Sequence, residues 1–224
     1  MIPLRDTVRS STIPYVNYAI IAANVVVFLF ELSLGRYLEN FIFQFGVVPA
    51  RFVEAFQARD ISVFAVLPFF SSMFLHGGWW HLIGNMLFLY IFGDNVEDRF
   101  GHGRYLIFYI VSGIAAALTQ VVINPSSGVP MVGASGAIAG VLGAYVLLYP
   151  KAKVVTLIPI FFFFQIIELP AYIFLGLWFL LQFFSGYMSL GVGGDAGGIA
   201  WWAHIGGFTC GVLLMPLLKK PRPT

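Results

Sequence analysis

Long uncharged stretches of apolar residues recur along this chain of 224 residues, and they constrain its fold more than any other feature. The chain is 59% hydrophobic and only 10% charged, with a mean hydropathy of +0.89. A soluble domain has about a quarter of its residues charged and could not bury this much apolar surface in one core. In lipid, where every backbone polar group needs an internal partner, such stretches form helices. The sequence therefore predicts an all-α membrane protein with one membrane domain over residues 1–224.

We expect a bundle of six spanning helices, because a helix needs about 20 mostly apolar residues to cross the hydrocarbon core. The expected helices cover about residues 14–34, 79–92, 105–122, 135–148, 169–187 and 199–218. The fifth is the end of a longer apolar region, 154–188, which Pro159, Glu168 and Pro170 interrupt. Between the first two helices, residues 35–60 mix phenylalanines with charged residues, which is typical of an interfacial loop at the headgroup level. A small extracellular cap without a catalytic role is the alternative interpretation of this loop.

The positions of the basic residues predict how the bundle is oriented. Six spans place both termini on one side, and nine of the twelve lysines and arginines then fall on that side. The other three are Arg36, Arg51 and Arg59. By the positive-inside rule, we expect a multi-pass protein of the cell membrane with both termini in the cytoplasm.

A serine between glycines, Ser135, opens the fourth expected helix in the segment 133–136. In a first helical turn the backbone N–H groups have no intrahelical partner, and the helix dipole adds partial positive charge. A serine in this position can attack a carbonyl carbon while nearby N–H groups stabilise the developing oxyanion. In the alternative interpretation, Ser135 is only an N-cap residue, and the small residues after it form a packing face.

The sixth expected helix carries His204 on the same face as Gly207 and Gly211. Glycines on this face let a neighbouring helix approach closely, so a neutral imidazole could reach a serine hydroxyl. A structural histidine bonded to a backbone carbonyl is the alternative. No aspartate or glutamate is well placed to orient His204, so the sequence favours a dyad of Ser135 and His204 over a triad.

The second expected helix carries His81 and Asn85 four residues apart, one above the other. Both side chains can donate hydrogen bonds, and together they would complete an oxyanion hole. A zinc site is a weaker interpretation, because no acidic residue lies near these histidines in the sequence. For His76, just before this helix, a polar network that ties helices together is the structural alternative.

Together, these three clusters resemble the rhomboid family of intramembrane serine proteases. Residues 45–50, 93–101 and the run from Glu168 to Gln182 are also similar to that family. The resemblance implies Ser135 as the nucleophile and His204 as its general base, with an oxyanion hole formed by His81, Asn85 and the Ser135 N–H. It further implies transmembrane protein substrates, cut near the extracytoplasmic end of their spanning helix, an active site open to that side, and no cofactor or metal.

One position departs from the pattern of many bacterial members, which carry a tyrosine one turn after the serine, stacked on the catalytic histidine. This chain has Ala139 there. We therefore expect an aromatic side chain from elsewhere, such as Trp201 or Trp202, to pack on His204.

Two other classes of function are alternatives to proteolysis. A catalytically inactive rhomboid-like protein would bind membrane clients without cutting them. A transporter or channel predicts charged residues within spans or inverted repeats, and Glu168 is taken as the only acidic residue inside an apolar run. Nucleic acid is not an expected partner at a net charge of +2. The glycine-rich segment 191–198 is expected to cap the active site from outside, with a plain connector as the alternative.

Overall fold

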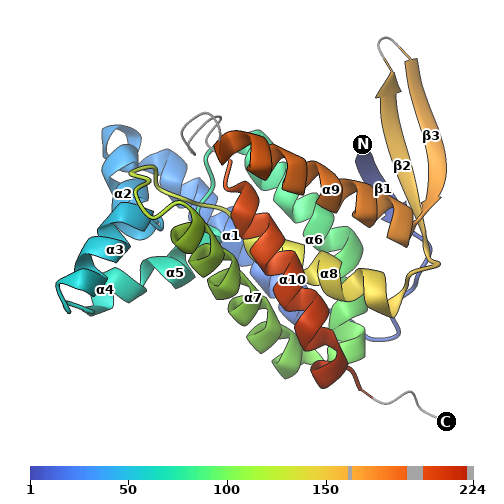
Figure 1. The fold of residues 1–224 in the computed structure, drawn as a ribbon. Coiled ribbons are helices and arrows are strands. Elements are labelled where there is room, and N and C mark those ends of the chain that lie inside the picture. Colours follow the sequence, from blue (N-terminus) through green and yellow to red (C-terminus); the bar gives the residue numbers. More distant parts are fainter. Residues whose placement is uncertain (161–162, 191–198, 221–224) are drawn as a thin grey trace.

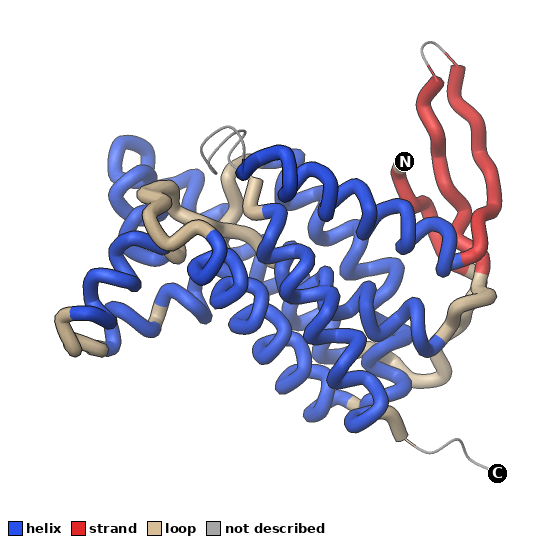
Figure 2. The backbone as a smooth tube through the Cα atoms, viewed as in Figure 1, coloured by secondary structure: helices blue, strands red, loops and turns tan. Residues whose placement is uncertain are grey.

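The computed structural model describes residues 1–160, 163–190 and 199–220, and it is predominantly helical (Figures 1 and 2). The α-helices in this part of the chain are α1 (Tyr15–Ser33), α2 (Leu38–Phe45), α3 (Pro49–Gln57), α4 (Val63–Val66), α5 (Pro68–Ser71), α6 (Trp79–Phe100), α7 (His102–Ile123), α8 (Ser135–Leu148), α9 (Ala171–Leu190) and α10 (Trp201–Leu218). Two 3₁₀ turns, η1 (Gly35–Tyr37) and η2 (Ser72–Phe74), join them. The strands are β1 (Ile2–Asp6), β2 (Lys153–Ile160) and β3 (Phe163–Pro170).

Four of the described helices, α1, α7, α9 and α10, are long and apolar enough to cross a bilayer. The helix α6 meets the same test together with the segment Val63–Phe74 before it, from which it bends by 78°. The helix α8 is apolar but has only 14 residues. The protein is therefore a polytopic helical membrane protein, and α1, α6, α7, α8, α9 and α10 lie where the sequence predicted spanning helices.

The short helix α8 lies in the core of the bundle, against α6, α7 and α10. All its residues from Ala137 to Tyr145 are buried, as expected for a helix that is apolar all round. Its contact with α10 is very close, because Gly207 and Gly211 of α10 lie against the backbone of α8. Small residues in such a contact let two helix backbones approach each other.

A small antiparallel sheet of order β1-β2-β3, not predicted from the sequence, lies beside the bundle (Figure 1). The strands β2 and β3 form a hairpin between α8 and α9, and β1 pairs with the first half of β2. The region 154–167 is rich in valine, isoleucine and phenylalanine, which favour strands. Hydropathy alone does not separate such a run from a helix, so the fifth apolar region contains a hairpin before its helix.

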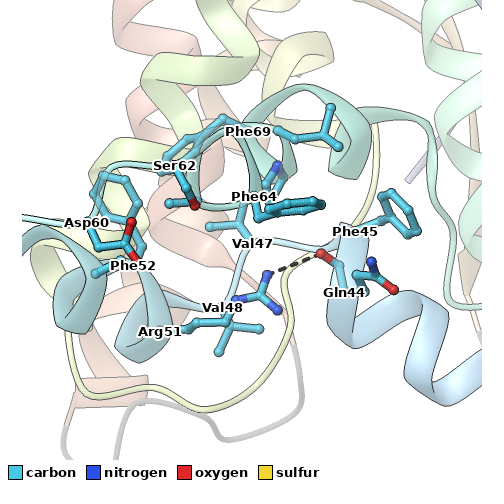
Figure 3. A pocket seen from close by; sticks show the side chains of 14 residues that line it. Gln44, Phe45, Val47, Val48, Arg51, Phe52, Asp60, Ser62, Phe64 and Phe69 are labelled. Carbon is cyan, nitrogen blue, oxygen red and sulfur yellow. Dashed lines mark hydrogen bonds between the residues drawn. The ribbon is translucent and has the colours of Figure 1, made fainter.

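The loop between α1 and α6 consists of short amphipathic helices with exposed aromatic residues such as Phe56 and Phe64. Arg51 of α3 donates a hydrogen bond to the carbonyl group of Phe43 at 2.7 Å, near the end of α2. It donates a second one to the carbonyl group of Gln44 at 3.2 Å (Figure 3). A cavity of about 340 Å³ lies between these short helices. The guanidinium group of Arg51 thus holds α2 against α3. This structural role explains why Arg51 lines the cavity.

The sheet is attached to the bundle through Asp6 at the end of β1. Its carboxylate accepts hydrogen bonds from the Tyr145 hydroxyl of α8 and from the Asn95 amide of α6, the latter at 3.0 Å. Loss of water on burial raises the pKa of the Asp6 carboxyl from 3.8 to about 6. The neighbouring Asp94 raises this pKa further, whereas the bond from Tyr145 lowers it.

This raised pKa predicts a specific dependence of stability on pH. The pKa of Asp6 in the folded state exceeds that of an exposed carboxyl, so the folded state binds the proton more tightly than the unfolded state. The stabilisation that results is complete below about pH 4 and is lost as pH rises through about 6. An Asp6→Asn variant keeps an oxygen acceptor but cannot ionise. We expect the unfolding temperature of the unaltered protein in detergent, relative to this variant, to fall over that interval and then level off. Parallel curves for the two proteins would contradict the assignment.

Candidate functional site

The side chain of Ser135 projects from the first turn of α8 toward α10. Its Oγ lies 2.8 Å from Nε2 of His204. The N-cap residue of α8 is Ala134, and no side chain caps the helix there, so the interpretation of Ser135 as an N-cap residue is wrong. The serine hydroxyl and the imidazole, 69 residues apart in the chain, form a hydrogen-bonded pair.

The second ring nitrogen of His204 has a partner on α9. Its Nδ1 lies 2.7 Å from Oε1 of Gln182. A carbonyl oxygen can only accept, so Nδ1 carries the hydrogen and Nε2 is free to accept the proton of Ser135. Gln182 thus selects the tautomer of His204 that a general base requires. The sequence offered no acidic partner for His204, and this role of Gln182 was not predicted from it.

Two tryptophans surround the imidazole of His204. The ring of Trp178 on α9 lies 6.0 Å away and tilted by 39°, and that of Trp201 lies 6.3 Å away and nearly perpendicular. Trp201 was one of the two expected aromatic neighbours. Trp202 instead packs edge-on against Phe183, and Trp178 was not anticipated.

His81 and Asn85 face the loop before Ser135 from α6. Gly133 in that loop has a φ of +122°, a conformation that favours glycine. A Cβ at this position would lie 2.7 Å from Nε2 of His81 and 3.6 Å from Nδ2 of Asn85. The absence of a side chain at Gly133 therefore lets the backbone that leads into Ser135 pass beside both donors.

Asn85 is held in place by a chain of polar contacts that reaches α1. Its Nδ2 lies 3.0 Å from Nε2 of His76. The backbone N–H of His76 lies 3.2 and 3.3 Å from the two carboxylate oxygens of Glu31, a residue only 1% exposed. His76 therefore belongs to a polar network that ties helices together. Glu31 lies inside α1, so the expectation that Glu168 is the only acidic residue in an apolar run is wrong.

A cavity of about 550 Å³ contains all four candidate residues in its lining. Ser135, His204, His81 and Asn85 come from three helices, and Trp178 and Gln182 add a fourth, α9. Polar groups gathered in one pocket of a largely apolar protein are the expected form of a binding or active site. The segment 191–198, predicted to cap this cavity, lies outside the described residues.

The protein thus combines a helical membrane fold with a part-buried, hydrogen-bonded pair of Ser135 and His204. The Rhomboid domain family model matches residues 64–221 of this chain. The chain therefore belongs to the rhomboid family.

Named relatives support this assignment. The chain is 29% identical over 207 residues to Rhomboid protein 1, mitochondrial, of Saccharomyces cerevisiae, covering 88% of this chain and 51% of that protein. It is 33% identical over 134 residues to Rhomboid protease GluP of Bacillus subtilis, covering 58% and 24% respectively. For Rhomboid-like protein 11, chloroplastic, of Arabidopsis thaliana, the identity is 33% over 126 residues, or 56% and 42%. The chain thus spans about half or less of the length of these relatives.

Proposed function

We propose that this protein is an intramembrane serine endopeptidase in which Ser135 is the nucleophile and His204 the general base. The observation that carries the proposal is the 2.8 Å contact between Ser135 Oγ and His204 Nε2 inside a cavity of the bundle. A named protease among the relatives supports the same reaction class.

The proposed reaction follows from the hydrogen bonds of His204. Nε2 takes the proton of the Ser135 hydroxyl as Oγ attacks the scissile carbonyl carbon. The resulting imidazolium gives this proton to the leaving amine, and an acyl-enzyme remains. Water, deprotonated by the same Nε2, then attacks the ester carbonyl carbon. The imidazolium returns this proton to Ser135 Oγ as the carboxylic acid product leaves. Throughout, Gln182 holds the ring through Nδ1.

The oxyanion of the tetrahedral intermediate needs donors on the side opposite His204. We assign this role to His81, Asn85 and the backbone N–H of Ser135. In the first turn of α8 this N–H has no intrahelical acceptor, and the helix dipole favours negative charge there. Gly133 supports the assignment, because its missing side chain leaves room between the backbone and His81.

Substrates of this activity would be transmembrane proteins. Ser135 and Trp201 begin α8 and α10, and Trp79 begins α6, so the site lies near one end of these three helices rather than at their middle. With both termini in the cytoplasm, as the basic residues predict, this end faces the extracytoplasmic side. Cleavage would then fall near that end of a substrate helix.

Labelling with a fluorophosphonate probe tests the proposal, because the probe forms a covalent bond only with an activated serine. The unaltered protein in liposomes should be labelled, whereas Ser135→Ala and His204→Ala should lose nearly all labelling. Equal labelling in all three proteins would refute the serine assignment. A folded unaltered protein that is neither labelled nor cleaves a substrate would instead favour a catalytically inactive, client-binding member of the family.

A further inference from the structure

The hairpin of β2 and β3 extends away from the helical bundle (Figures 1 and 2). Its eight residue pairs run from Lys153 and Pro170 at the base to Ile160 and Phe163 at the far end. The strand β1 pairs with β2 only as far as Leu157. We call the four residue pairs from Leu157 and Ile166 to the far end the distal half; beyond Leu157 it is a two-stranded ribbon.

The distal half exposes apolar side chains on both of its faces. Phe163 is 76% exposed, Phe164 70% and Ile166 64%. Consecutive residues of a strand point to opposite faces, so Phe163 and Phe164 lie on different sides of the ribbon. An antiparallel sheet in water normally has one polar face, and a two-stranded hairpin is only marginally stable there.

Because both faces of the ribbon are apolar, the pattern indicates whether protein or lipid covers it. A protein partner or a second copy of the chain would dock on one face and leave the other aromatic face in water. A surrounding apolar medium covers both faces at once. Lipid is such a medium, and α9, which follows the hairpin, is long and apolar enough to cross it.

The base of the hairpin is charged and attached to the bundle. Lys153 and Glu168 form an ion pair at 2.8 Å, and Lys151 and Arg5 are exposed nearby. The N–H of Ala171, at the start of α9, donates to the carbonyl of Ala152 at 2.7 Å. The base thus lies at the level where α8 ends and α9 begins. Basic residues at a membrane surface are attracted to lipid phosphates.

We propose that the distal half of this hairpin inserts into the bilayer as an interfacial anchor, with the basic residues of its base against the phosphates of the same leaflet. Insertion is limited in depth, because no strand in the described part of the chain pairs with the outer edge of β3. Its unpaired backbone groups are costly in the hydrocarbon core. The aromatic side chains then lie at the boundary between headgroups and acyl chains.

Fluorescence quenching in vesicles tests this proposal independently of any catalytic activity. Three variants of the full chain with Cys210→Ala would each carry one cysteine, at Phe163→Cys, Phe164→Cys or Lys151→Cys. Each cysteine would carry a nitrobenzoxadiazole label. The vesicles contain phosphatidylcholine and phosphatidylglycerol. We expect spin-labelled lipid to quench the labels at 163 and 164 several-fold more than the label at 151. Iodide in the water should quench the label at 151 several-fold more than the other two.

Two results would overturn the proposal. Equal iodide quenching at all three positions would show that the distal half lies in water. Protection of either aromatic position from both quenchers, together with crosslinking between copies, would show that protein rather than lipid covers it. Unfolding temperatures in detergent identify any variant that disturbs the fold. Because the labels at 163 and 164 are measured in separate variants, one correctly folded variant of these two is enough for the test.

Discussion

Cleavage of a transmembrane substrate in proteoliposomes is expected to fall about 10⁴-fold or more when Ser135 is replaced by alanine. The reason is that the proposed mechanism has one nucleophile, the Ser135 hydroxyl. His204→Ala should have a similar effect, because an unactivated serine hydroxyl is a weak nucleophile. Initial rates of product formation measure both losses.

A double variant makes this prediction sharper. Residues that act as one catalytic unit are non-additive, so Ser135→Ala combined with His204→Ala should be no slower than either single variant. The matched control is Ser112→Ala, which removes a hydroxyl from a fully buried serine of α7 without touching the Ser135–His204 pair. Its cleavage rate should stay near that of the unaltered protein. Losses that multiply in the double variant would mean that the two residues act separately.

Hydropathy located the membrane helices well but not their full lengths. The helix α6 was expected to end near residue 92 and continues to Phe100. Its last turns are polar, and their side chains bond the start of the chain: Glu97 accepts hydrogen bonds from the backbone N–H groups of Val16 and Asn17 at 3.0 and 2.7 Å. A hydropathy pattern reports where lipid begins and ends, whereas this helix extends beyond the lipid to cap α1.

The residues of the site were predictable to different degrees. Ser135, His204, His81 and Asn85 could be recognised from residue type and helical spacing, because polar groups within apolar helices are rare and need a reason. Gln182 and Glu31 could not be assigned partners in this way. Their contacts, to His204 and to His76, join residues 22 and 45 positions apart along the chain, and only packing brings them together. For both Gln182 and Glu31, the sequence feature that could have indicated a role is a polar residue within an apolar helix.

Replacing Gly211 by alanine is expected to destabilise the bundle and to abolish labelling of Ser135, although Gly211 lies two turns away from His204. A Cβ on Gly211 would lie 2.0 Å from the carbonyl oxygen of Gly140 and 2.8 Å from its Cα. Both atoms belong to the α8 backbone and cannot rotate away, so α8 and α10 must separate. Overpacking of this kind costs about 1–3 kcal/mol or more, against a gain in helix propensity of about 1 kcal/mol.

The same separation would act directly on the site, because Ser135 and His204 lie on these two helices and meet at 2.8 Å. A matched control is Gly176→Ala in α9, where an added Cβ meets no atom of the described residues within 4 Å. There the helix propensity of alanine acts alone, so the unfolding temperature should stay the same or rise, and labelling should persist. Gly207→Ala should behave like Gly211→Ala, since its Cβ would lie 2.0 Å from the carbonyl oxygen of Gly136. If the two α10 variants instead behaved like Gly176→Ala, the close glycine contact would not be what holds the serine and the imidazole together.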